Sequence, residues 1–314
     1  MSAAPGPVLV TGAGGFAGGY LLELLAGAGD ELVAWARSPV PRHAVALARW
    51  QQVDLLDRET VRRTIDTLRP SQVYHCAGSP HVAQSWQDTA GPLAANVLGT
   101  HHLLDALRRT GAGGRVLVTG SAAIYASSPV PIAEDHVVAP ASPYALSKLA
   151  QEELSLRFLR EEGLDVVVAR PFNHTGPRQS AAFVAPSMAR QVALIERGAL
   201  EPVIKVGNLD AQRDISDVRD VVRAYAALMR AGCPGTSYNV ASGVGRTMRS
   251  ILDGLLMRAR VPVQVATDPA RLRPNDVPFL VGDPSRLGRT TGWKPAIPFD
   301  RTLDDLLEYW RAHA

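Results

Sequence analysis

The feature of this sequence that most constrains its fold is a glycine-rich turn, Gly12-x-x-Gly15-x-x-Gly18, between a short apolar run at 7–11 and a helical pattern at 20–25. The apolar run has no helical period, so we predict a strand there. Glycine allows the backbone to turn sharply and to approach a pyrophosphate, and the first turn of the following helix offers that anion unpaired N–H groups. The order of strand, turn and helix predicts a dinucleotide-binding unit. A turn that is merely rich in glycine is the alternative.

The remainder of the chain alternates between strand and helix patterns. A second apolar run at 31–36 completes the first βαβ unit, and further runs begin at Val73, Arg115 and Asp165, each after a segment with helical spacing. Such alternation predicts parallel strands covered by helices on both faces. The expected fold class is therefore α/β: a Rossmann doubly wound parallel sheet with a smaller α/β substrate-binding domain.

We expect the two domains to interleave along the chain, which has 314 residues, 46% of them hydrophobic, and can form a large core. The predicted dinucleotide-binding domain comprises residues 1–173, with 213–242 returning to it. Residues 174–212 and 243–314 are expected to form mainly the substrate-binding domain.

The composition disfavours several classes of function. The 33 basic and 30 acidic residues are intermixed, with a net charge of +3, so we expect no nucleic-acid partner. No apolar run is long enough to span a bilayer and the N-terminus lacks a basic leader, so we expect no membrane partner and a cytoplasmic location. Cys76 and Cys233 are too few for a disulfide framework, and we expect both to be reduced and packed. The eight histidines lack the spacing of metal ligands, so no metal is expected.

The end of the second predicted strand indicates the cofactor. NAD enzymes of this plan usually place an Asp or Glu there, which accepts hydrogen bonds from the ribose 2′-hydroxyl. This chain has Arg37, whose guanidinium can pair with a 2′-phosphate. NADP is therefore favoured over NAD, unless Arg37 is simply an exposed basic residue. Asp54 is expected near the adenine amino group, and Ala77 where the cofactor lies close to a strand end.

Tyr144 and Lys148 are candidates for proton transfer. They lie four residues apart on a predicted helix that Ser142 caps and Pro143 begins, so they share one face. The cation of Lys148 is expected to lower the pKa of the Tyr144 phenol and make it a usable acid or base. Ser121 follows a predicted strand, at the sheet edge where ligands bind, and its hydroxyl can meet Tyr144 there. By itself, a tyrosine and a lysine at this spacing are more typical of a solvated helix face. The glycine-rich turn upstream favours instead a role of the pair in proton transfer.

Three motifs together resemble the extended short-chain dehydrogenase/reductase family that acts on nucleotide sugars. They are the sequence TGAGGFAG at 11–18, Ser121 four residues before Tyr125, and Tyr144-x-x-x-Lys148. The resemblance implies that Ser121, Tyr144 and Lys148 are a catalytic triad. It also implies that Lys148 contacts the nicotinamide ribose and that hydride passes between the nicotinamide and C4 of the sugar. The predicted cofactor contacts are Gly12, Gly15, Phe16, Gly18, Arg37, Asp54, Leu55, Ala77, Tyr144, Lys148 and Pro171.

The second half of the chain is similar to the branch of that family that processes GDP-mannose. Segments 170–179, 183–191 and 206–220 carry the similarity, which extends from Val8 to about Trp310. It implies a GDP-sugar substrate, with the beginning of segment 170–179 bordering the nicotinamide and the substrate diphosphate. Because a diphosphate requires cations, the predicted substrate contacts are Asn173, Arg190, Lys205, Arg213 and Arg273, with Arg178 as a further candidate.

Dehydratases and reductases of this branch share these motifs, and the chemistry of elimination separates them. Removal of water across C5 and C6 needs a base for the C5 proton, which such dehydratases supply as a carboxylate just after the catalytic serine or threonine. Ala122 and Ala123 follow Ser121 here, and we expect Glu134 and Asp135 to lie at the surface. The sequence therefore predicts that NADPH reduces the C4 ketone of GDP-4-dehydro-6-deoxy-D-mannose to a GDP-6-deoxyhexose of the GDP-rhamnose type.

Three alternative functions and one partner complete these expectations. The alternatives are a GDP-mannose 4,6-dehydratase, another NDP-sugar 4-epimerase or reductase, and a catalytically silent NADP-binding sensor or scaffold. The helices near 97–109 and 144–161 resemble those that form a four-helix dimer interface in the family, which implies a homodimer. The apolar residues that we assign either to that interface or to the core are Leu103, Leu107, Leu154, Leu156 and Phe158.

Overall fold

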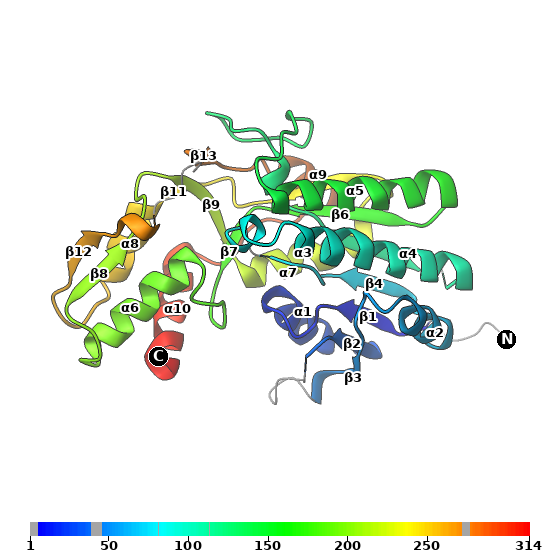
Figure 1. Ribbon diagram of the computed structural model, residues 1–314, viewed down its shortest axis with the longest axis horizontal. Helices are drawn as coiled ribbons and strands as arrows, with labels where there is room; N and C mark the ends of the chain where they lie inside the picture. Colours follow the sequence, from blue (N-terminus) through cyan, green and yellow to red (C-terminus); the bar gives the residue numbers. More distant parts are fainter. Residues whose placement is uncertain (1–5, 39–45, 81, 113, 272–276) are drawn as a thin grey trace.

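The computed structural model describes residues 6–38, 46–80, 82–112, 114–271 and 277–314. Its largest element is a seven-stranded parallel sheet with the strand order β10-β6-β5-β4-β1-β2-β3 (Figure 1). The order of the strands along the chain reverses between β1 and β4. The strands of this sheet are β1 (Val8–Thr11), β2 (Leu32–Ala36), β3 (Arg49–Gln52), β4 (Gln72–His75), β5 (Arg115–Thr119), β6 (Val166–Pro171) and β10 (Ser237–Val240).

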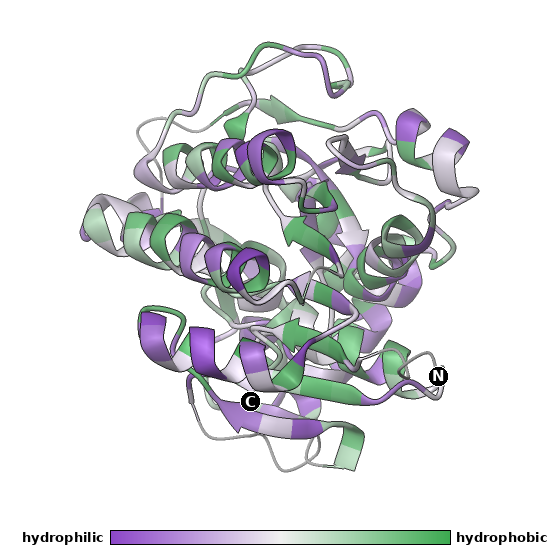
Figure 2. Ribbon diagram, turned by 90° about the vertical axis from the view of Figure 1, so that its right-hand side faces the viewer, coloured by the Kyte–Doolittle hydropathy of each residue, from purple (hydrophilic) through white to green (hydrophobic). Residues whose placement is uncertain are grey.

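Helices cover both faces of this sheet, which explains why its central strands read as continuous apolar runs. One face packs against α1 (Phe16–Ala26), α7 (Val218–Ala231) and α9 (Ser285–Thr291). The other packs against α2 (Arg58–Leu68), α4 (Gly99–Thr110) and α5 (Pro143–Glu162). The central strands are mainly hydrophobic, as Figure 2 shows. The predicted doubly wound α/β sheet is confirmed.

A smaller α/β lobe lies at the opposite end of the molecule from the N-terminus (Figure 1). Its own hydrophobic cluster is formed mainly by its helices together with residues of β8 and β9. Two small sheets build it, one of β7, β9, β11 and β13, the other of β8 and β12. The predicted residue boundaries of the two domains stay a prediction. The elements of the lobe are β7 (Asn173–Thr175), α6 (Val184–Glu196), β8 (Val203–Val206), β9 (Gln212–Asp217), β11 (Gly245–Thr247), α8 (Met248–Leu256), β12 (Gln264–Thr267), β13 (Phe279–Leu280) and α10 (Phe299–His313).

Short helical turns join these elements near the carboxyl ends of the large sheet. They are η2 (Gln84–Trp86), α3 (Ala90–Pro92), η3 (Leu93–Leu98) and η4 (Ala122–Ile124), with η5 (Pro269–Arg271) in the smaller lobe. Helix α5 begins as predicted: the Ser142 hydroxyl accepts the N–H of Ala145 at 3.1 Å, and Pro143 occupies the first turn. Gly163 ends the helix in the left-handed conformation, with φ of 72°. The Ser142 cap fixes the start of α5, and therefore the place of Tyr144.

Several predicted packing roles are decided by this architecture. Leu103, Leu107 and Phe158 are buried in the core beneath α4 and α5, whereas Leu154 and Leu156 pack against that core while partly exposed. Both cysteines are unbridged, as predicted. The prediction that both are packed is wrong for Cys233, which is exposed, because it lies just beyond the end of α7. In the described ranges no helix has the length and apolarity to cross a bilayer.

Candidate active site

The predicted site residues of the N-terminal half gather at the carboxyl edge of the large sheet. Gly12 follows β1, Arg37 follows β2, Ala77 lies two residues beyond β4, and Ser121 two residues beyond β5. Pro171 is the last residue of β6. This edge, at the reversal of strand order, is where doubly wound sheets bind their ligands.

Ser121 and Tyr144 come together as predicted. Ser121 ends an extended segment after β5, caps η4 by accepting the N–H of Ala123 at 3.1 Å, and lies close enough to the Tyr144 hydroxyl to interact with it. Tyr144 lies in the first turn of α5 and is partly buried. A hydroxyl and a phenol in contact at the sheet edge provide two donors that one substrate oxygen can meet.

The pKa of Tyr144 shifts in the direction opposite to our prediction. Burial raises the pKa of the phenol above its ordinary value, and the hydrogen bond with Ser121 lowers it by less. Lys148 is not among the causes of this shift. The phenol is therefore protonated at neutral pH, as a free tyrosine is, and it is available as a proton donor.

Lys148 lies one turn farther along α5 and is itself buried. Its ammonium donates to the backbone carbonyl of Thr119 and to Oε1 of Gln151, both at 2.9 Å. Burial lowers the pKa of this amine to about 8. Two of the three ammonium hydrogens are thus directed at described protein oxygens. One of these oxygens belongs to Thr119, which lies two residues before Ser121.

Glu134 requires a correction, because it is buried rather than at the surface, although its neighbour Asp135 is exposed. One carboxylate oxygen accepts the N–H of Asn239 at 2.9 Å, and the other pairs with the guanidinium of Arg286 at 3.3 Å. Both oxygens are therefore occupied by β10 and α9. The chain beyond Ser121 places the small side chains of Ala122 and Ala123 where an elimination base was sought.

The glycine-rich turn has the shape that a pyrophosphate cradle requires. Gly12 has φ of +67°, and a Cβ there would lie 2.6 Å from the backbone nitrogen of Ala77. A Cβ on Gly18 would lie 2.2 Å from the carbonyl oxygen of Gly12. Gly15 caps α1 without a side chain, and the first turn of α1 has no acidic residue. Glycine at these positions therefore lets the turn pack tightly against the chain beyond β4, and the first turn of α1 brings no acidic side chain against an anion at its N-terminus.

The other predicted cofactor contacts lie around this turn. Arg37 is exposed and its backbone carbonyl accepts from Gln52, while Asp54 is exposed and its carboxylate accepts the N–H of Leu56 at 2.9 Å. The carbonyl of Leu55 lies 2.8 Å from a ring nitrogen of His102. The ring of Phe16, another predicted cofactor contact, stacks on the ring of His174, with the two ring centres 5.9 Å apart.

The predicted substrate contacts divide into two groups in the smaller lobe. Asn173 and Arg213 lie on the neighbouring strands β7 and β9, and Arg213 is half-buried. Arg190 and Lys205 are both exposed, on α6 and β8, and the guanidinium of Arg190 lies 5.9 Å from the ring centre of Trp310. Arg273 lies outside the described residues.

Arg178, the further candidate, pairs with the carboxylate of Glu23 and lies 3.8 Å from the ring centre of Tyr20. These contacts tie the segment after β7 to α1, beside the glycine-rich turn. The side chain of Arg178 therefore already serves the junction between the two parts of the chain.

Comparisons with known proteins agree on one family. The family described as GDP-mannose 4,6 dehydratase matches residues 9–306. A GDP-6-deoxy-D-mannose reductase of Pseudomonas aeruginosa is 38% identical over 308 residues, which cover 97% of each chain. A GDP-mannose 4,6 dehydratase of Arabidopsis thaliana is 31% identical, covering 96% of this chain and 85% of the relative. This chain belongs to the GDP-mannose 4,6-dehydratase family.

Solved structures place the same fold around nicotinamide cofactors. The structure of RMD from Pseudomonas aeruginosa complexed with NADPH has a TM-score of 0.86 at 35% identity, covering 98% of this chain and all of that one. The UDP-glucose 4-epimerase of Thermus thermophilus in complex with NAD has a TM-score of 0.87 at 30% identity, with 98% and 99% covered. The predicted extended short-chain dehydrogenase/reductase fold is therefore confirmed for this family member.

Sequence reasoning missed the buried polar residues that support the site. Arg170, expected to border the cofactor, is buried. Its guanidinium forms a bidentate ion pair with Glu152 and also donates to the hydroxyl of Tyr125. Gln151, which holds Lys148, was also missed. A polar residue three positions after a catalytic lysine, on the same helix face, is the signal that indicates it.

Proposed function

We propose that this chain is an NADP(H)-dependent reductase that converts the C4 ketone of GDP-4-dehydro-6-deoxy-D-mannose into a GDP-6-deoxyhexose of the GDP-rhamnose type. The observation that carries the proposal is that Ser121 lies against a protonated Tyr144. Ser121 is followed in the chain by Ala122 and Ala123, and not by a carboxylate. The similarity to a reductase over nearly the whole chain supports it.

Tyr144 is the proposed proton donor. Its raised pKa keeps the phenol protonated at neutral pH, so it can give its proton to the alkoxide that forms at C4. Ser121 is proposed to hold the carbonyl oxygen against that phenol. NADPH, when bound, supplies the hydride. The cation of Lys148 then stabilises the phenolate that Tyr144 becomes, because opposite charges in a buried site attract strongly.

The cofactor contacts stay predictions. The tight glycine turn before α1, together with a first helical turn that lacks acidic side chains, supports a pyrophosphate at the N-terminus of α1. Arg37 is proposed to pair with the 2′-phosphate of NADP, since it follows β2 and is exposed. Lys148 is proposed to use its remaining N–H on the nicotinamide ribose.

The substrate diphosphate is proposed to lie between the sheet edge and the smaller lobe. Arg213 is the principal candidate for binding it, because it is half-buried on β9 beside the strand of Asn173. Arg190, Lys205 and Arg273 stay further candidates for the nucleotide.

The reductase and the dehydratase are separated by one assay. The protein is supplied first with GDP-mannose alone, and then with the 4-keto-6-deoxy sugar nucleotide and NADPH, while NADPH absorbance and sugar products are followed. We expect NADPH consumption only with the ketone. Turnover of GDP-mannose without added cofactor would instead identify a dehydratase and refute the proposal.

The variant Tyr144→Phe tests the assignment of the proton donor. We expect kcat to fall by about 10²- to 10⁴-fold, the usual contribution of general acid catalysis. The affinity for NADPH, measured by fluorescence titration, should stay unchanged because the ring is retained. A variant that keeps most of its turnover would show that another group donates the proton.

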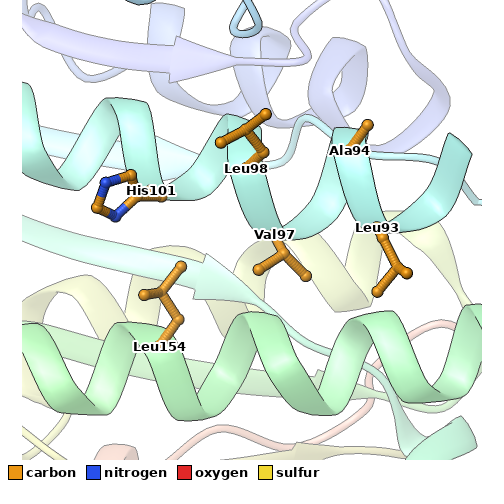
Figure 3. A pocket seen from close by; sticks show the side chains of 6 residues that line it. All are labelled: Leu93, Ala94, Val97, Leu98, His101 and Leu154. Carbon is orange, nitrogen blue, oxygen red and sulfur yellow. The ribbon is translucent and has the colours of Figure 1, made fainter. Parts of the chain in front are cut away.

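We further propose a homodimer formed through α4 and α5. A largely apolar groove lies between the continuous η3–α4 segment and α5, and it is lined by Leu93, Ala94, Val97 and Leu98 of η3, His101 of α4 and Leu154 of α5. Figure 3 shows Val97 and Leu154 pointing toward one another across it. Leu93 and Leu98 are each more than two-fifths exposed, which favours a covered face in solution. Light scattering should give twice the chain mass of 33.6 kDa, and Leu98→Glu should give the monomer. The cytoplasmic location stays a prediction.

A further inference from the structure

A chain of buried hydrogen bonds connects the amine of Lys148 to the glycine-rich turn. Four fully buried side chains from different elements form this series of hydrogen bonds: His75 from β4, Thr100 from α4, Gln151 from α5 and Thr11 from β1. Gln151 Nε2 donates to the hydroxyl of Thr100 at 2.8 Å, and His75 lies between the hydroxyls of Thr100 and Thr11 at 2.7 and 2.8 Å.

The direction of every bond in the chain is set by the donors and acceptors available. An ammonium only donates, so Lys148 must face the amide oxygen of Gln151, and the amide nitrogen must face Thr100. The Thr100 hydroxyl gives its one proton to the carbonyl of Asn96 at 2.6 Å. It therefore accepts from both Gln151 and His75, and the proton of a neutral His75 must lie on Nε2.

The bonds of His75 on the cofactor side have fixed directions as well. His75 Nδ1 is then an acceptor, and the Thr11 hydroxyl donates to it while accepting the N–H of Ala77 at 3.3 Å. Thr11 directly precedes Gly12. The amide of Gln151 thus cannot turn over without breaking bonds at both of its ends, and its oxygen is held toward Lys148.

We propose that Gln151 is a positioning residue that aims the amine of Lys148, and that Thr100 and His75 hold its amide in the required orientation. The inference rests on the proposed role of Lys148 in the reductase. Without the Gln151 oxygen, the amine would keep only the Thr119 carbonyl as its observed partner, and its third N–H, which is proposed to meet the nicotinamide ribose, would lose its fixed direction.

Few charges surround Lys148, so a change at Gln151 should be visible in a pH profile. His75 stays neutral because burial lowers its pKa to about 3, and Cys76 stays a thiol because burial raises its pKa to about 12. Both lie on the strand side of Lys148, and Tyr144 lies on its own helix with a raised pKa. The amine is the group in this cluster that titrates near pH 8.

The test uses Gln151→Met, which removes the acceptor, and Gln151→Glu, which keeps an acceptor and adds a charge. We expect Gln151→Met to lower kcat by about 10- to 100-fold, as for loss of a hydrogen bond to a charged group. The alkaline limb of its kcat profile should move to lower pH. Gln151→Glu should recover part of kcat and move that limb to higher pH.

The matched control is Ser155→Ala, one turn farther along α5. Ser155 is also fully buried, and its hydroxyl donates to the backbone carbonyl of Gln151 and not to the side chain of that residue. The kcat and the pH profile of Ser155→Ala should match those of the wild type, even if its Tm is lower. NADPH affinity, measured by fluorescence without sugar, should weaken by up to about tenfold in Gln151→Met and not in the control.

The outcomes separate the alternatives. If Gln151→Met lowers Tm but leaves kcat and the alkaline limb unchanged, Gln151 only supports the fold and the inference is wrong. If Gln151→Met does not fold, the limb of Gln151→Glu decides, since it moves only if residue 151 acts on Lys148. A wild-type enzyme inactive on the ketone would refute the proposed function instead, while the NADPH affinities would still test the link to Lys148.

Discussion

The buried pair of Arg170 and Glu152 provides the most demanding prediction about stability. The guanidinium lies 2.6 Å from one carboxylate oxygen and 3.0 Å from the other, and the carboxylate also accepts the hydroxyl of Ser237. Only 10% of the arginine side chain and 1% of the glutamate side chain are exposed. The same guanidinium donates to the hydroxyl of Tyr125, four residues after Ser121, and to the carbonyl of Glu134.

The perturbation is Glu152→Gln, which keeps the shape and removes the charge. Removing one partner of a buried ion pair leaves an uncompensated charge and costs about 3–5 kcal/mol. This is a large fraction of a total stability of about 5–15 kcal/mol. With a urea m-value of about 3 kcal/mol/M, the unfolding midpoint should fall by about 1–1.7 M.

The neighbouring Glu153→Gln is the matched control. Glu153 lies on the same helix, and its carboxylate is 3.9 Å from Arg160, with both side chains about three-fifths exposed. Exposed pairs of this kind contribute about 0–1 kcal/mol, so the midpoint should hardly change. Urea unfolding followed by circular dichroism measures both variants. Equal shifts for the two would refute the reasoning that burial of the charge sets the cost.

Four further predictions concern the cofactor site and the pH dependence of Lys148. Arg37→Ala should weaken NADPH by about 10- to 100-fold, from about 1.5–3 kcal/mol for a charge-assisted contact, and leave NADH unchanged in a fluorescence titration; equal losses would contradict it. Gly12→Ala should abolish NADPH binding, because its Cβ would meet the Ala77 backbone, whereas Gly29→Ala shares a positive φ but has open space around it and should bind normally. Turnover should fall as pH rises through about 8, where the buried Lys148 loses its proton, and a profile flat to pH 10 would argue against a role for the cation. Because the folded pKa of Lys148 is lower than that of the unfolded chain, its burial makes stability rise with pH between about 8 and 10.5, a rise that Lys148→Met should remove in urea titrations.

Local patterns predicted much of the fold and of the site. The glycine spacing, the apolar runs and the caps of α5 depend on residues close in sequence, so the strand, turn and helix around Gly12 and the start of α5 were correct. The spacing of Tyr144 and Lys148 on one helix is likewise local. The meeting of Ser121 and Tyr144 followed from the rule that strand ends share one edge of a parallel sheet.

The protonation and the partners of those same groups were decided by tertiary structure alone. Packing around Tyr144 raised the pKa that the nearby lysine was expected to lower, because desolvation depends on every segment that covers the ring. Glu134 became buried because β10 and α9, more than 100 residues away, supply its partners. Lys148 is held by Gln151, whose amide is oriented by Thr100, 51 residues earlier. The sequence by itself therefore determined which chemical groups this protein brings to the sheet edge, whereas contacts distant along the chain determined their charge and direction.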